Sequence, residues 1–112
     1  MGELMYQSHD AYTECGLGSC ATSAIVDIVQ SLGSSRNGGI SGLFGAKITG
    51  GGAGGTVCVL GLRSAVNTFH QDVVDVYYTK HISSSSNSSN CNYPYVFVGS
   101  SIGADAFGIR YF

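Results

Sequence analysis

The feature that most constrains the fold of this chain is a cluster of glycines near its middle. Five of the six residues from Gly50 to Gly55 are glycine, and the sixth is Ala53. Glycine has no Cβ, so it adopts conformations closed to other residues and lets another group approach the main chain closely. It also loses the most backbone entropy on folding, so a dense cluster is disfavoured unless that shape is needed. Successive N–H groups in such a loop form a concave nest that attracts anions such as phosphate.

Apolar segments flank the glycines on both sides. Residues 43–48 precede them, and residues 56–60, Thr-Val-Cys-Val-Leu, follow. Apolar and β-branched residues favour strands, so we predict two strands joined by an enlarged hairpin connection. Cys58, in the second strand, is expected to be a small core residue.

Three helices are predicted around this hairpin. The first covers residues 3–14 and ends at Gly16, the second runs from Ser19, a good N-cap, to Gly33, and the third covers residues 63 to about 80. Within the third, residues 73–78, Val-Val-Asp-Val-Tyr-Tyr, have strand-type side chains, so a strand is the alternative there. One face of the first helix carries Leu4, Ala11 and Cys15. Apolar residues recur at helical spacing in the second helix: Ala21, Ala24, Ile25, Ile28, Val29 and Leu32.

The remaining segments complete one domain over residues 1–112. The Ser/Asn tract of residues 83–92 is expected to be a flexible connection, and residues 95–98 and 107–112 are expected to be strands. The resulting order, α-α-β-β-α-β-β, predicts the α+β class. We expect a two-layer sandwich in which helices cover one face of a small antiparallel sheet.

The composition restricts the partners. Only 11% of residues are charged, against about 25% in an average chain, and no basic stripe predicts nucleic-acid binding. No stretch approaches the roughly 20 apolar residues of a membrane span. Low charge with an apolar content of 44% indicates a surface covered by more protein, so self-association is one expectation.

The ends and the cysteines indicate a cytoplasmic chain without a metal site. The N-terminus lacks the basic and apolar regions of a signal peptide, so reduced thiols are expected. The four cysteines and three histidines show no zinc-binding spacing.

Three interpretations of the glycine cluster compete. Gly50-x-Gly52-x-x-Gly55 fits the dinucleotide fingerprint, and Asp75 lies about 20 residues further on, but that fingerprint opens a helix and here a strand is predicted. A phosphate-binding Walker loop has its lysine after the glycines, whereas Lys47 precedes them. The third interpretation is a plain, flexible hairpin turn.

The residues around the cluster resemble the third motif of the GHMP kinases. That motif is a strand, Lys-x-Thr-Gly-Gly-Gly-x-Gly-Gly and a second strand, and residues 47–55 read Lys-Ile-Thr-Gly-Gly-Gly-Ala-Gly-Gly. Residues 4–9, 15–19, 55–60 and 99–108 are also similar to the galactokinase-like sugar kinases of this family. The resemblance implies the ferredoxin-like C-terminal domain of such a kinase.

The resemblance also implies the site residues. The loop expected to approach the sugar and the ATP phosphates consists of Thr49, Gly50, Gly51, Gly52, Ala53, Gly54 and Gly55. Lys47 is either a point charge for phosphate or a structural residue of its strand. His9 either lines the site, since the first helix borders the cleft in this family, or is a polar helix residue with a local hydrogen bond.

ATP and Mg²⁺ are the implied cofactors, with a sugar as the second substrate. In this family the phosphates are held mainly by an N-terminal half that also carries the catalytic Asp, and the chain shows no such half. No catalytic residue and no metal ligand is therefore expected here. We expect one lobe of an ATP-dependent sugar 1-kinase, inactive alone; the alternative is a non-catalytic, self-associating remnant.

Some residues depart from the family pattern. Gly16-Leu17-Gly18-Ser19 is similar to the phosphate loop of the second motif, but it lies within the C-terminal half of the pattern and is interpreted as a turn between helices. Ser23 and Ala24 stand where relatives have an Asp and a basic residue, and Ile102 replaces a proline. The tract of residues 83–92 is foreign to the family.

Overall fold

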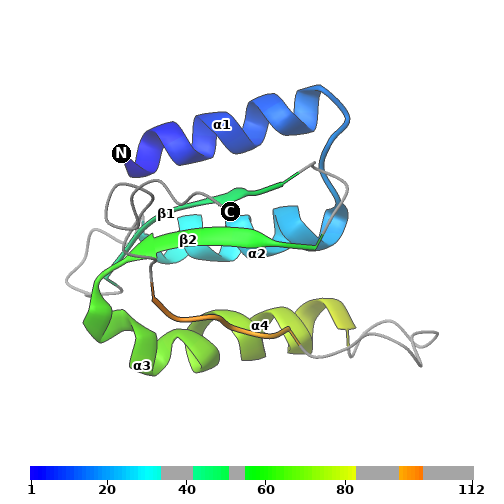
Figure 1. Ribbon diagram of the computed structural model, residues 1–112. Helices are drawn as coiled ribbons and strands as arrows, with labels where there is room; N and C mark the ends of the chain where they lie inside the picture. Colours follow the sequence, from blue (N-terminus) through cyan, green and yellow to red (C-terminus); the bar gives the residue numbers. More distant parts are fainter. Residues whose placement is uncertain (34–41, 51–54, 83–93, 100–112) are drawn as a thin grey trace, which may run out of the picture.

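A computed structural model describes residues 1–33, 42–50, 55–82 and 94–99 of the chain, and these form three helical stretches and a two-stranded antiparallel sheet (Figure 1). The elements are α1 (Gly2–Glu14), α2 (Cys20–Gly33), β1 (Leu43–Ile48), β2 (Val57–Gly61), α3 (Val66–Phe69) and α4 (Asp75–Tyr77). A 3-10 turn, Arg63–Ala65, and two π-helical segments, His70–Val74 and Tyr78–Ile82, make α3 and α4 parts of one helical stretch.

The predicted α+β class and the hairpin are confirmed. The helices and strands before residue 82 begin and end within about two residues of their predicted bounds. The tract predicted at residues 83–92 and the strand predicted at residues 107–112 lie outside the described residues. Within the described residues, the sheet consists of β1 and β2. The ferredoxin-like arrangement therefore stays a prediction. None of the helices in the described part is long and apolar enough to cross a membrane.

The turn between α1 and α2 depends on Gly16 and Ser19. Gly16 has a φ of 73°, and the N–H groups of Gly16 and Leu17 donate to carbonyl oxygens in the last turn of α1. This pattern is the Schellman ending of a helix. Ser19 Oγ then accepts a hydrogen bond from the Thr22 N–H at 3.2 Å and caps α2. The interpretation of this segment as a stop followed by a cap is confirmed.

The core lies between α2, the helical stretch of residues 63–82 and one face of the sheet. Its buried members are Val26, Val29, Leu43, Ala46, Ala65 and Val73, with Val57, Val59 and Phe69 packed against them. Ala21, predicted on the apolar face of α2, is exposed, whereas Val26 is buried. The buried face of α2 is thus rotated slightly from the predicted one.

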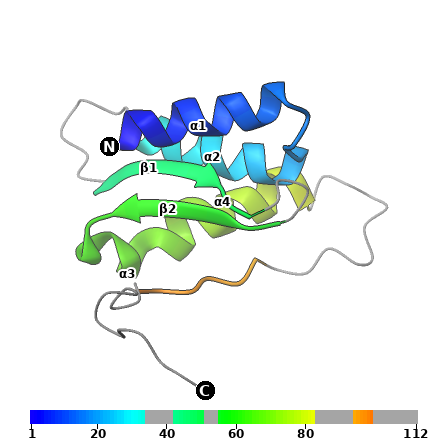
Figure 2. The ribbon, with the colours of Figure 1, turned by 45° about the horizontal axis from the view of Figure 1, so that its top comes forward.

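α1 lies along the outer edge of β1 in backbone contact with it (Figures 1 and 2). A Cβ on Gly45 would lie 2.6 Å from the Cα of Gly2, and a Cβ on Gly2 would overlap the carbonyl oxygen of Phe44. His9, at the middle of α1, accepts a hydrogen bond on Nδ1 from the Ile48 N–H at 3.4 Å. Natural sheets cover exposed strand edges with helices in this way.

The predicted apolar face of α1 is wrong. Leu4 is 66% exposed, and Ala11 and Cys15 are exposed too, whereas His9 is buried. The close backbone approach turns Gly2 toward β1, and the larger side chains that face the rest of the fold are Met5, beside Gly45, and Tyr6, which packs against the core.

The prediction that Cys58 belongs to the core is also wrong. Cys58 is exposed, because the alternation of side chains along β2 points Val57 and Val59 toward the core and Cys58 to the opposite face.

Residues 95–98 are not a strand in the described structure. They run as an extended segment beside the helical stretch of residues 63–82 (Figures 1 and 2). A strand requires a hydrogen-bonded neighbour, and the described residues place none beside this segment.

Replacing Gly45 with alanine should destabilise the fold. The new Cβ would meet the backbone of Gly2 at 2.6 and 2.9 Å, so α1 must move away from β1. We expect a loss of about 3 kcal/mol in the free energy of unfolding, measured by urea denaturation. Gly55→Ala is the matched control, because its Cβ would meet no atom of the part of the chain that the structure describes within 4 Å. Equal stability of the two variants would contradict the α1–β1 contact.

Tyr6→Phe should be neutral or stabilise the fold by up to about 1 kcal/mol at pH 7, because the buried Tyr6 hydroxyl has no hydrogen-bond partner among the described residues. Burial, followed by the charge of Glu3, raises the pKa of Tyr6 above 10.0. The folded state therefore holds this proton when the unfolded chain has lost it, and wild-type stability falls relative to Tyr6→Phe as pH rises above about 10. Thermal melts from pH 8 to 11 measure this; a pH-independent difference would contradict it.

Candidate functional site

The glycine loop connects the two strands of the hairpin, and the structure describes both of its ends. Thr49 donates its N–H to the Thr56 carbonyl at 3.2 Å and so closes the β1–β2 ladder. Gly50 follows with a φ of 80°, a left-handed conformation that favours glycine. A Cβ on Gly50 or on Gly55 would meet no atom of the described residues within 4 Å. The loop therefore starts from a fixed strand end, and no described residue crowds Gly50 or Gly55 on that side.

The inner loop residues lie outside the described part of the chain. These are the predicted site residues Gly51, Gly52, Ala53 and Gly54. Of the predicted loop, the structure thus places Thr49, Gly50 and Gly55, all of them exposed.

This arrangement excludes the dinucleotide fingerprint. The glycines of that fingerprint open a helix, whereas here they are followed by strand β2. Asp75, the acidic residue considered for the ribose, lies on α4 and is exposed. The strand–loop–strand context agrees with a hairpin turn and with the GHMP third motif.

Lys47 points from β1 toward α1. Its Nζ donates a hydrogen bond to Ser8 Oγ at 3.2 Å and lies 5.7 Å from the centre of the Tyr12 ring. A lysine over an aromatic face gains a cation–π attraction of about 0.5–1 kcal/mol. Lys47 is half-buried and engaged with two residues of α1, so this geometry supports its structural interpretation.

His9 is 5% exposed, and each of its described polar contacts is internal. Its Nδ1 accepts from the Ile48 N–H, and its carbonyl accepts from Thr13 Oγ1 at 3.1 Å. Because Nδ1 accepts, the ring proton of the neutral imidazole resides on Nε2. The sequence predicted only a local hydrogen bond for His9 as its structural role. The structure shows in addition a long-range hydrogen bond that joins α1 to β1.

Sequence reasoning missed Ser8 and Tyr12. They lie four residues apart on α1, which places them on one face of the helix, and both contact Lys47. That i, i+4 spacing was visible in the sequence, but nothing in it indicated a lysine opposite.

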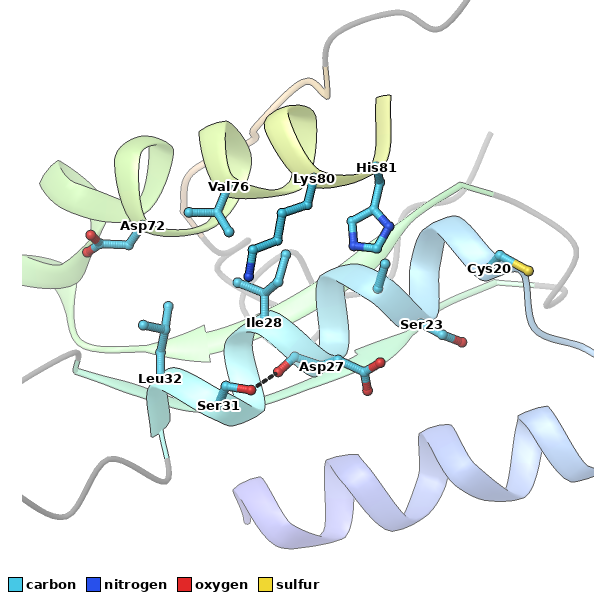
Figure 3. Close-up of a pocket in the computed structure, with 11 residues that line it drawn as sticks. Cys20, Ser23, Asp27, Ile28, Ser31, Leu32, Asp72, Val76, Lys80 and His81 are labelled. Carbon is cyan, nitrogen blue, oxygen red and sulfur yellow. Dashed lines mark hydrogen bonds between the residues drawn. The ribbon is translucent and has the colours of Figure 1, made fainter. Parts of the chain in front are cut away.

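A groove of about 550 Å³ lies between α2 and the helical stretch of residues 63–82 (Figure 3). Its lining includes Ser23, Ala24, Asp27, Asp72, Lys80 and His81. Of the predicted loop residues, the described ones, Thr49, Gly50 and Gly55, do not line this groove, whereas the two family departures Ser23 and Ala24 do. No group of three His, Cys, Asp or Glu side chains among the described residues is placed to hold a metal ion.

Comparison with curated proteins shows that the chain is related to L-arabinokinase of Arabidopsis thaliana. The two are 40% identical over 109 residues, which is 96% of this chain. The chain spans 10% of the length of that relative. No protein-family profile matches the sequence, and no solved structure matches it.

The contact between Lys47 and Ser8 predicts an energetic coupling. Lys47→Met and Ser8→Ala each remove the same hydrogen bond, so the double variant should lose less stability than the two single variants added together. We expect a coupling of about 1 kcal/mol from urea denaturation of the four proteins in a double-mutant cycle. Strict additivity would show that Lys47 and Ser8 do not interact in solution.

Proposed function

We propose that this chain is the C-terminal lobe of an ATP-dependent sugar 1-kinase of the L-arabinokinase and galactokinase type, within the GHMP kinase family. The observation that carries the proposal is the sequence identity to L-arabinokinase along nearly the whole chain. The strand–loop–strand setting of residues 47–57 supports it, because it is the setting of the third GHMP motif. The ferredoxin-like fold and a cytoplasmic location belong to the same proposal.

The role of the loop follows from the chemistry of phosphoryl transfer. The protein accelerates this reaction mainly by positioning the reactants and stabilising charge. Thr49 and Gly50 follow directly after the end of β1, which the Thr49–Thr56 hydrogen bond fixes. No described residue lies within 4 Å of a Cβ built on Gly50 or Gly55. In the proposed enzyme, residues 49–55 use this space to bring main-chain N–H groups close to the sugar and the γ-phosphate.

The described residues fit the phosphates of ATP better than its metal ion. Main-chain N–H groups in glycine loops suit phosphate oxygens. Mg²⁺ prefers carboxylate and phosphate oxygens with several waters, and the described residues near Gly50 and Gly55 offer no acidic cluster. In the proposed enzyme the carboxylates for Mg²⁺ and the catalytic base therefore come from another part of the polypeptide.

The alternative function is a non-catalytic interaction domain. It is favoured by the internal engagement of Lys47 and His9, the two candidates outside the loop. The large exposed apolar side chains also favour it, since they indicate a surface that another protein covers. Phe44 is 53% exposed and Phe97 is 88% exposed.

Gly55→Ala separates the two functions. Its Cβ meets none of the described residues within 4 Å, so the chain should fold with unchanged stability. If the loop approaches a ligand, the added methyl group should lower activity about tenfold, which corresponds to about 1.4 kcal/mol of transition-state stabilisation. The assay combines the chain with the preceding kinase part of L-arabinokinase and measures ATP-dependent sugar phosphorylation.

The control for this assay is Ser64→Ala, an exposed residue of the 3-10 turn after β2. It should leave the phosphorylation rate unchanged. An ATP titration followed by amide shifts should move the signals of residues 50–55. Absence of activity in the combined protein, together with no shift in these signals, would reject the kinase proposal in favour of the interaction domain.

A further inference from the structure

The two edges of the sheet differ in how they are covered by the other described elements. The outer edge of β1 is covered by α1, with the Ile48 N–H bonded to His9. Because Thr49 donates to Thr56, the alternating antiparallel pattern turns the N–H and C=O groups of Val57 and Val59 away from β1. None of the described hydrogen bonds engages these groups. Within the described part of the chain, β2 therefore presents an open edge.

A second segment also lacks backbone partners among the described residues. Residues 95–98, Tyr-Val-Phe-Val, consist of residue types that favour strands. No described hydrogen bond involves residues 94–99. Tyr95 is 80% exposed and Phe97 is 88% exposed, and their rings contact each other at a centroid distance of 4.7 Å. Pro94, which precedes Tyr95, and Val96, which lies between the two aromatic residues, are half-buried.

Neither surface carries a charge that would prevent strand pairing. Residues 57–62, Val-Cys-Val-Leu-Gly-Leu, and residues 94–99, Pro-Tyr-Val-Phe-Val-Gly, contain no Lys, Arg, Asp or Glu. Natural edge strands usually avoid association through charged side chains, through bulges or by being covered. Both views place the segment on the β2 side of the molecule, away from α1 (Figures 1 and 2).

We propose that two copies of this chain associate by strand exchange, each adding its residues 95–98 to the open β2 edge of the other. In this arrangement Val96 continues the core-facing side of the sheet with Val57 and Val59. Tyr95 and Phe97 then lie on the opposite face beside the exposed Cys58. The reciprocal exchange is isologous, so it closes as a two-fold dimer.

A second copy is the occupant that satisfies both unpaired surfaces at once. Within one chain the open edge and the segment are both present, yet they are not hydrogen-bonded to each other. A two-stranded sheet is marginal alone and gains stability from a third strand. The inference does not rest on the kinase proposal, because it uses none of the glycine-loop residues.

The oligomeric state tests the surface. Sedimentation equilibrium over a range of concentrations should show a monomer–dimer equilibrium for the wild-type chain. Cys58→Lys and Phe97→Lys place a charge on each proposed surface at exposed positions, so each should raise the dimer dissociation constant about tenfold or more. Gln30→Lys, exposed on α2, is the matched control and should leave it unchanged. Circular dichroism verifies that each variant folds.

Disulfide trapping tests whether residues 95–98 are the segment that pairs with the β2 edge. In a background with Cys15, Cys20 and Cys91 replaced by serine, Tyr95→Cys or Phe97→Cys should form a disulfide with Cys58, because facing Cβ atoms in paired strands lie within disulfide range. Val96→Cys is the control and should not, since it lies on the other face.

Mixing equal amounts of ¹⁴N- and ¹⁵N-labelled chains identifies the partner. Disulfides between light and heavy chains would support exchange between copies. Disulfides confined to single chains would show that the segment pairs with its own β2, and would overturn the proposal. A monomer at all concentrations, or trapping through Val96→Cys alone, would overturn it too.

Discussion

The backbone contact between α1 and β1 is the constraint on which the rest of the described structure depends. It requires glycine at both Gly2 and Gly45, since a Cβ on either would meet the main chain opposite. The contact brings the buried His9 ring within hydrogen-bonding distance of the Ile48 N–H, which would otherwise be an unpaired donor at a covered strand edge. α1 thereby completes one side of a hairpin that would be marginal alone.

The α1–β1 contact fixes the position of the strand that leads into the glycine loop. Ile48, bonded to His9, immediately precedes Thr49, and Thr49 closes the ladder with Thr56. Lys47, one residue earlier, is bonded to Ser8 of the same helix. The strand that leads into the loop is therefore held by three successive residues, and Gly50 is the first residue free of this support. Such an arrangement suits a loop that must be presented at a defined place.

The sequence predicted local features well and long-range ones poorly. Gly16, Ser19 and the hairpin were predictable because caps and turns depend on residues close in the chain. The buried face of α1 was not, because it is selected by Gly45, more than thirty residues away. Residues 95–98 have strand-forming side chains but no adjacent partner among the described residues, and whether a partner is adjacent depends on the tertiary structure. The predicted loop was located correctly between its strands, whereas the partners of Lys47 required the structure.

In the proposed kinase site, the glycine loop supplies main-chain N–H groups, whereas the charge of Lys47 is directed elsewhere. A glycine loop offers main-chain N–H groups, which carry only partial positive charge. Phosphoryl transfer also needs full charges, usually from Mg²⁺ and Lys or Arg side chains. In the described structure the lysine nearest the loop is bonded to Ser8 and stacked near Tyr12, so its charge is directed to α1. Lys47 and the glycines therefore make different contributions: the lysine anchors the strand, and in the proposed kinase the loop would shape a site whose full charges come from other residues.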